Sequence, residues 1–154
     1  KNKVISLITD AGTPTISDPG MILVNKCIEE NLSVYPIPGS SAATSAVSVS
    51  GFSDQYLFYG FLTKKENELE NTLKSLCNLD YSIVFFIPSP KINFYISQFK
   101  KYFFDRKIVI AKEMTKIYEE FKSLLFFLEY IKQKLIQNKV ALKLVSILYF
   151  NKEY

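Results

Sequence analysis

The run Ile8-Thr9-Asp10-Ala11-Gly12-Thr13-Pro14-Thr15-Ile16-Ser17-Asp18-Pro19-Gly20 decides how the first part of this chain is interpreted. The apolar residues 4–8 are typical of a buried strand, and the Gly, Pro, Ser, Thr and Asp residues that follow predict a turn. Residues 21–24 then read as a helix, with Asp18 as the expected N-cap and Pro19 at the first helical position. The pattern therefore predicts a strand, a loop of small residues and a helix N-terminus.

This loop has the properties of a ligand site. In a parallel sheet, the junction between a strand and the next helix lies at the carboxyl edge, where ligands of open α/β folds bind. Gly12 allows the backbone to approach a ligand closely, and the helix start offers unpaired N–H groups. Hydroxyl groups are available from Thr9, Thr13, Thr15 and Ser17. A capped loop without a ligand explains the same composition, so local physics leaves both interpretations open.

A second loop of small residues follows the next apolar stretch. Residues 32–37 predict a second strand, and Pro38-Gly39-Ser40-Ser41-Ala42 leads into a short helix over residues 40–50, which either serine is suited to cap. Strand, helix, strand and helix joined by short loops predict a parallel α/β unit. Because two strands alone leave the faces of a sheet partly uncovered, we expect that an N-terminal piece of this unit is missing.

A second α/β domain with a mixed sheet is expected after the short polar segment 51–54. We assign residues 1–52 to the remainder of an N-terminal ligand-binding domain and residues 53–154 to a C-terminal domain. The expected strands of the second domain are residues 55–62, 83–87, 107–111 and 140–150, and its expected helices are residues 66–79, 94–103 and 119–138.

The composition is that of a globular protein, with 48% hydrophobic and 22% charged residues in a chain of 154. The net charge of +4 is compatible with a nucleic-acid partner but does not require one. The chain contains no histidine, which excludes histidine bases and most zinc sites, so no metal is expected. There is no apolar run of about 20 residues, so no membrane span is expected. The two cysteines, Cys27 and Cys77, fall in apolar helical patterns, and buried free thiols suit a cytoplasmic setting.

Three short strings are together similar to a known family. Asp10-Ala11-Gly12-Thr13-Pro14, Ser17-Asp18-Pro19-Gly20 and Pro36-Ile37-Pro38-Gly39-Ser40-Ser41-Ala42 have an order and spacing that closely resemble the tetrapyrrole methylase-like superfamily. Within it, the chain resembles the ribosomal RNA small subunit methyltransferase I family of 16S rRNA cytidine 2′-O-methyltransferases. The resemblance is strong from Val4 to about Phe121, and the tail that follows is divergent.

The resemblance implies a fold, a cofactor and a reaction. The implied fold is the end of a parallel-sheet N-terminal domain, which binds the cofactor, followed by a mixed-sheet C-terminal α/β domain. The implied reaction is methyl transfer from S-adenosyl-L-methionine to a ribose 2′-oxygen of 16S rRNA in the small ribosomal subunit, by an enzyme that forms a homodimer. The implied cofactor-binding residues are Asp10, Gly12, Thr13, Pro14, Ile16, Ser40, Ser41 and Ala42.

A later block, Lys112-Glu113-Met114-Thr115-Lys116, resembles the family's Arg-Glu-Leu-Thr-Lys block on the substrate side of the site. Glu113 and Lys116 are the implied catalytic residues. A carboxylate is a weak base toward a ribose hydroxyl, so orientation and electrostatics must contribute more than proton transfer. Thr115 is the implied substrate contact, and Lys64 and Lys65 are candidates, from their charge alone, for contact with phosphates of the substrate. Solvated surface charge is the alternative interpretation of these charged side chains.

Two departures from the family leave other functions open. The family's first Gly-containing loop is absent, and Pro88-Ser89-Pro90-Lys91-Ile92 replaces its Glu-Ser-Pro-His-Arg block. The activity of this N-terminally truncated chain is therefore a separate hypothesis, and an inactive remnant that acts only as a dimerising α/β module is one alternative. A methyltransferase that acts on a tetrapyrrole is the other, and Asp at the position of Thr13 would have favoured it.

Overall fold

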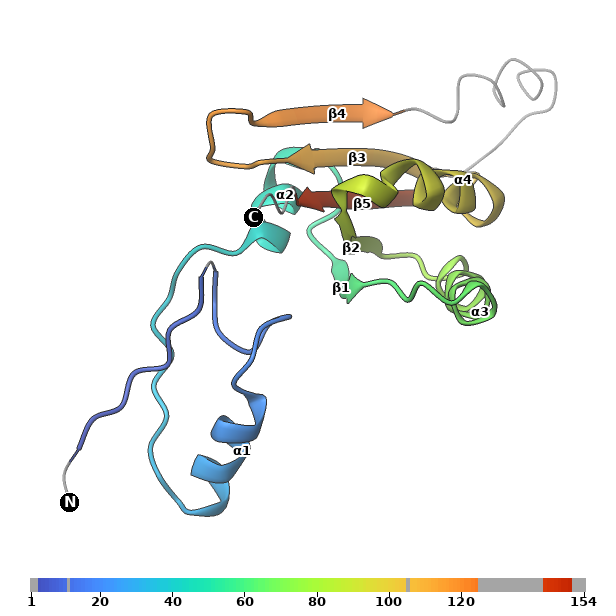
Figure 1. Cartoon of the computed structure of the whole chain (residues 1–154). Coiled ribbons are helices and arrows are strands. Elements are labelled where there is room, and N and C mark those ends of the chain that lie inside the picture. The colour runs from blue at the N-terminus through green and yellow to red at the C-terminus, as the bar shows by residue number, and fades with distance from the viewer. Residues whose placement is uncertain (1–2, 11, 105, 125–142, 151–154) are drawn as a thin grey trace, which may run out of the picture. The chain divides into compact units, whose positions relative to one another are not determined.

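The structure is a computed structural model that describes residues 3–10, 12–104, 106–124 and 143–150. The chain divides into two compact units, Lys1–Ala42 and Ala43–Tyr154. Figure 1 shows the course of the chain through its helices and strands. The division falls inside the stretch assigned to the first domain, because helix α2 (Ala42–Ser50) packs on the sheet of the second unit. The expected domain boundary after Phe52 stays a prediction.

The second unit is built on a sheet in which the last strand lies in the middle. The strands are β1 (Tyr56–Phe61), β2 (Ser82–Pro88), β3 (Arg106–Lys112), β4 (Glu120–Leu124) and β5 (Lys143–Phe150). Their order across the sheet is β1-β2-β5-β3-β4. The first four strands of this order run parallel, and β4 runs antiparallel to β3. The predicted mixed α/β architecture is confirmed.

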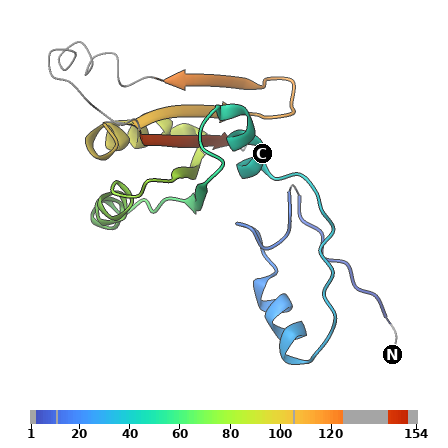
Figure 2. The same cartoon turned by 180° about the vertical axis from the view of Figure 1, so that it is seen from behind.

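Helices cover both faces of this sheet. The helices besides α2 are α3 (Glu66–Leu76) and α4 (Ile92–Tyr102), with a short 3₁₀ turn, η1 (Ser89–Lys91), before α4. On one face, α3 and α4 pack against alternate residues of β2 such as Ile83 and Phe85. On the other face, Ala43 and Ala46 of α2 pack near Val84, because small side chains let a helix approach closely. Figures 1 and 2 show α4 and α2 on opposite sides of the sheet.

The predicted helix over residues 119–138 is wrong at its start. Phe121 and Leu124 fit a helical spacing, but the structure places them in β4, where Leu124 stands opposite Ile108 of β3. Pairing with the open edge of β3 satisfies the backbone hydrogen bonds of this segment, and the helical spacing of its apolar residues carries no information about that distant partner. Residues 125–138 lie outside the described residues. The predicted strand over residues 140–150 is confirmed by β5.

The first unit contains helix α1 (Met21–Glu29), and the strands predicted over residues 4–8 and 32–37 are wrong. A strand needs a neighbouring strand for its backbone hydrogen bonds, and the described residues of this unit supply none. Apolar side chains of both segments consequently remain in contact with solvent. Val4 is 95% exposed and Ile37 is 82% exposed.

Helix α1 begins after Gly20 and not after Asp18, so the predicted N-cap is wrong. Gly20 is the N-cap residue, with φ of 131°, and no side chain caps the helix. A Cβ atom on Gly20 would lie 2.4 Å from Cδ2 of Leu7 and 3.1 Å from Cγ2 of Thr15. Glycine therefore fits this position both because of its positive φ and because the loop approaches residue 7 closely.

A buried arginine joins the start of β3 to the loop between α3 and β2. Arg106 has no solvent-exposed surface, and its guanidinium donates hydrogen bonds to the carbonyl oxygens of Cys77 and Tyr81, each at 3.1 Å, and of Leu79. The guanidinium carbon lies 5.3 Å from the centre of the Phe103 ring. One side chain thus donates to three part-buried backbone carbonyl groups.

Replacing Arg106 with methionine tests this role. The Arg106→Met variant is expected to lower the free energy of unfolding by about 2–4 kcal/mol, because it removes three hydrogen bonds from a buried charged group to part-buried carbonyl groups. Urea unfolding followed by circular dichroism measures the change. The exposed Lys101→Met variant on α4 is the control and is expected to stay within about 0.5 kcal/mol of the original chain. Equal stabilities of the two variants would contradict the role of Arg106.

Candidate functional site

The first unit brings the two predicted cofactor loops together. Gly12 has φ of 79°, and a Cβ atom built on it would lie 3.6 Å from the carbonyl oxygen of Ser40. A side chain at position 12 would therefore meet the backbone of the second predicted loop. Ser41 is half-buried directly before α2, and Ala42 is the first residue of that helix.

The first loop is held in a strained conformation. Thr15 and Ser17 have φ of 73° and 62°, in the region that side chains with a Cβ rarely adopt. Such residues raise the energy of the folded chain by about 1–3 kcal/mol each, and they concentrate at ligand clamps and active sites. Strain at a β-branched residue such as Thr15 makes this loop a candidate for a functional site.

One polar atom of this loop is buried without a partner. The hydroxyl oxygen of Thr9 is buried and has no hydrogen-bond partner among the described residues. Native proteins rarely leave such a group unsatisfied, so it marks a place where a ligand can donate or accept a hydrogen bond. Among the other predicted residues of the loop, Thr13 and Pro14 are half-buried, whereas Asp10 and Ile16 are exposed.

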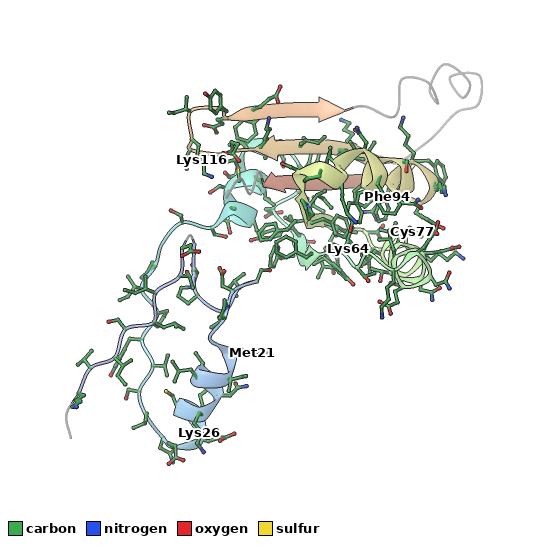
Figure 3. All side chains as sticks on the ribbon, in the orientation of Figure 1. Met21, Lys26, Lys64, Cys77, Phe94 and Lys116 are labelled. Atoms are coloured by element: carbon green, nitrogen blue, oxygen red, sulfur yellow. The ribbon has the colours of Figure 1, made fainter. Side chains whose placement is uncertain are left out.

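The predicted catalytic residues lie in the loop between β3 and β4 of the second unit. The Lys116 ammonium is 3.3 Å from a carboxylate oxygen of Glu113, whose side chain is only 12% exposed, whereas that of Lys116 is 62% exposed. The backbone N–H of Lys116 also donates to the carbonyl of Glu113 at 2.9 Å. Figure 3 shows Lys116 at this turn. The structure therefore brings the two implied catalytic residues into one ion pair.

The loop between β3 and β4 is strained in the same way as the loop around Gly12. Glu113 has φ of 51° and Thr115 has φ of 64°. Between them, Met114 packs against the hydrophobic cluster on the α2 side of the sheet and fixes the loop to it. The role of Met114 was not predicted, although a single apolar residue inside a polar block was a usable signal.

Lys64 and Lys65 follow the end of β1. Lys65 pairs with Glu68 at 2.8 Å on the first turn of α3, whereas Lys64 makes no ion pair with any described residue. The hydroxyl of the buried Tyr95 donates to the carbonyls of Leu62 and Thr63, 3.3 Å from each, and burial raises the pKa of Tyr95. The backbone just before the two lysines is therefore fixed.

Metal-binding clusters and membrane-spanning helices are both absent from the described ranges. No group of three or more His, Cys, Asp or Glu residues there is arranged to hold a metal ion. No helix in that part of the chain is both long enough and apolar enough to cross a membrane. Cys27 and Cys77 are free thiols and are half-buried.

No family model matches the chain. Comparison with curated proteins does identify relatives. Several curated relatives are named Ribosomal RNA small subunit methyltransferase I. The one from Thermotoga maritima is 41% identical over 122 residues, which are 79% of this chain and 54% of the relative. The one from Bacillus subtilis is 38% identical, with 77% of this chain and 41% of the relative covered. The one from Rickettsia prowazekii is 34% identical, with 90% of this chain and 51% of the relative covered.

The resemblance inferred from the motifs is confirmed, because the chain is homologous to proteins of this name over most of its length. The chain spans about half the length of the curated relatives it matches. The match to the Rickettsia prowazekii relative covers 90% of the chain, more than residues 1–122 alone provide. Part of the tail expected to be divergent is therefore similar to that relative.

Backbone strain in the loop between β3 and β4 can be measured through its effect on stability. The Thr115→Gly variant is expected to raise the free energy of unfolding by about 0.5–1 kcal/mol, because glycine adopts a φ of 64° without the steric penalty of a β-branched residue. The Thr72→Gly variant in α3 is the matched control and is expected to lower it by roughly 0.3–0.5 kcal/mol. Urea unfolding compares the two, and an equal loss of stability in both variants would show that Thr115 is not strained.

Proposed function

We propose that this chain carries the cofactor loops and the substrate loop of an enzyme that methylates the ribose 2′-oxygen of a cytidine in 16S rRNA, with S-adenosyl-L-methionine as methyl donor. The observation that carries the proposal is the homology to rRNA small subunit methyltransferases over 77–90% of the chain. The close approach of the Gly12 backbone to Ser40 supports it, because it joins the two loops implied to bind the cofactor. The chain itself is a substantial part of such an enzyme, and its own activity is part of the proposal.

The residues of the first unit fit the methyl donor. The unsatisfied hydroxyl of Thr9 offers a hydrogen bond to a polar group, and Gly12 leaves room for a ligand to lie against the backbone. The implied contacts are Asp10, Gly12, Thr13, Pro14, Ile16, Ser40, Ser41 and Ala42. When bound, S-adenosyl-L-methionine supplies an electrophilic methyl group on its sulfonium, so the protein has only to align the acceptor and accommodate a proton.

The residues of the second unit fit the substrate side. Glu113 is largely buried and its carboxylate is held by Lys116, an arrangement that fixes its direction and suits it to accept a hydrogen bond from the ribose 2′-hydroxyl. Lys116 would stabilise the negative charge that develops on the 2′-oxygen as its proton leaves. Thr115 would contact the ribose, and Lys64 and Lys65 would contact phosphates, which position an RNA without reading its sequence.

The alternatives are less well supported. The names of the relatives favour an RNA substrate over a tetrapyrrole. An inactive dimerising module would not need the strained backbone at Thr15 and Thr115. The homodimer and the cytoplasmic location remain proposals, and a ribosomal substrate would require the latter. Sedimentation of the chain as a monomer alone at micromolar concentrations would remove the homodimer.

Calorimetric titration of S-adenosyl-L-methionine tests the cofactor site. The original chain is expected to bind it saturably, and the Gly12→Arg variant is expected to lose this binding, because the new side chain would occupy the space between the loops. Gly51→Arg is the matched control, since Gly51 has a similar φ of 67° but no atom within 4 Å of the position of its Cβ. It is expected to bind as the original chain does. No binding by an original chain that circular dichroism shows to be folded would contradict the cofactor proposal.

Transfer of a tritium-labelled methyl group to unmodified small ribosomal subunits tests the reaction. Digestion of the labelled RNA to nucleosides is expected to yield 2′-O-methylcytidine, and the Glu113→Gln variant is expected to lower the rate about 100-fold if the carboxylate accepts the proton. Lys101→Met provides the control on the α4 surface, with the rate of the original chain expected. Label on a nucleobase would contradict the proposed acceptor atom.

A further inference from the structure

A bulge near the end of β1 determines the face of the sheet on which its last residues lie. Phe58 and Gly60 stand opposite adjacent residues of β2, so Tyr59 between them is an extra residue. Gly60 has φ of 81°, a conformation that such a bulge requires. Because side chains alternate along a strand, the extra residue moves Phe61 to the same face as Phe58.

The ring of Phe86 contacts Phe61 without covering it. The Phe86 ring lies edge-to-face against both Phe58, at 4.9 Å between centroids, and Phe61, at 5.3 Å. Phe58 and Phe86 are half-buried against the cluster on the α2 side of the sheet. Phe61 is 54% exposed, since β1 is the outermost strand and no described strand pairs with its other edge. Phe61 therefore presents a solvent-exposed aromatic ring whose position is restrained by Phe86.

The segment after Phe61 has a fixed backbone and leads directly to a lysine. Leu62 is buried against α3 and α4, on the face opposite Phe61. The hydroxyl of Tyr95 holds the carbonyls of Leu62 and Thr63. Lys64 comes next, is exposed and makes no ion pair with any described residue, and Figure 3 shows it beside the sheet. A cation and an aromatic ring therefore lie three residues apart at the end of one strand.

The loop that carries Glu113 and Lys116 leaves the same edge of the same sheet. Strands β1 and β3 are parallel, so Phe61 and this loop both lie at the carboxyl edge. Met114 packs against the cluster that includes Phe58 and Phe86, which places the loop on the face of Phe61. With β2 and β5 between them, the two features are separated by about 14 Å, from three strand spacings of about 4.8 Å.

We propose that Phe61 is a stacking platform for an unpaired base of the RNA substrate, and that Lys64 contacts the adjacent phosphate. The proposal rests on the proposed function and adds the surface that holds the RNA strand. Single-stranded RNA is recognised by aromatic rings on which bases stack, combined with cations that follow the backbone. A single strand fits better than a duplex, because a paired base inside a helix has no free face to offer a ring. The exposed charge of Lys64 favours a phosphate backbone over an apolar protein surface.

The absence of tryptophan from the chain allows a direct test. The Phe61→Trp and Phe94→Trp variants each carry a single tryptophan. Phe94 is the matched control, because it is 39% exposed and lies edge-to-face on Tyr95 at 5.2 Å, but it belongs to α4 on the opposite face. Each variant is titrated with a short cytidine-containing single-stranded RNA, and separately with inorganic polyphosphate, which has charge but no bases. Binding of the labelled RNA is followed in parallel by fluorescence anisotropy.

RNA is expected to quench the tryptophan of the Phe61→Trp variant and to leave that of the Phe94→Trp variant unchanged, while polyphosphate quenches neither. The Phe61→Leu variant, which keeps apolar contact with Phe86, is expected to weaken RNA binding by about tenfold or more, and Phe94→Leu is expected to leave it unchanged.

These measurements distinguish failure of the stacking platform from failure of the proposed RNA substrate. RNA binding in the anisotropy measurement without quenching of the Phe61→Trp variant would overturn the platform and leave the proposed function standing. Failure of the original, folded chain to bind RNA would overturn both the platform and the RNA substrate. A Phe61→Leu variant that melts at a lower temperature, or sediments as a smaller species, with unchanged RNA affinity would assign Phe61 to packing or to contact with a second copy.

Discussion

The sheet of the second unit depends on the pairing of β5 with two strands that do not pair with each other. β5 lies parallel to β2 along one edge and parallel to β3 along the other. It therefore joins the β1-β2 pair to the β3-β4 hairpin by backbone hydrogen bonds. Because β5 is distant in sequence from β2, this pairing forms only after a long loop is closed. It also aligns the carboxyl ends of β1, β2 and β3 at one edge, from which the loops with Lys64 and Lys116 emerge.

Patterns that depend on local physics were predicted well from the sequence. The continuous apolar run 83–87 predicted a strand buried on both faces, and β2 is such a strand. The amphipathic pattern after residue 66 predicted α3, whose Leu69 and Leu73 are buried as expected. The predicted secondary structure was wrong where it depends on pairing with a strand that is distant in sequence. Phe121 joined β4 rather than a helix because β3 offered an open edge, and residues 4–8 stayed outside any sheet because no described strand lies beside them.

The sequence motifs named the residues of the candidate site, whose role stays a prediction, but they did not indicate its geometry. The motifs named Gly12, Ser40, Glu113 and Lys116. In the structure Gly12 lies close to Ser40, and Lys116 forms an ion pair with Glu113. No sequence rule places Gly12 near Ser40 or assigns a positive φ to Thr115, since both depend on how the surrounding chain packs. The open ring of Phe61 was missed because one extra residue in a strand reverses the faces of all that follow. The glycine at position 60 was the available signal.

The central claim is that the loops around Gly12 and Ser40 form one cofactor site. The chain has five glycines, so ¹⁵N-glycine labelling gives a simple amide spectrum in which each loop is represented. Gly12 and Gly39 belong to the two loops, whereas Gly51 and Gly60 belong to neither. We predict that S-adenosyl-L-methionine shifts the amide signals of Gly12 and Gly39 and leaves those of Gly51 and Gly60 in place. Unchanged signals from Gly12 and Gly39 at saturating cofactor, or shifts confined to Gly51 and Gly60, would contradict the account.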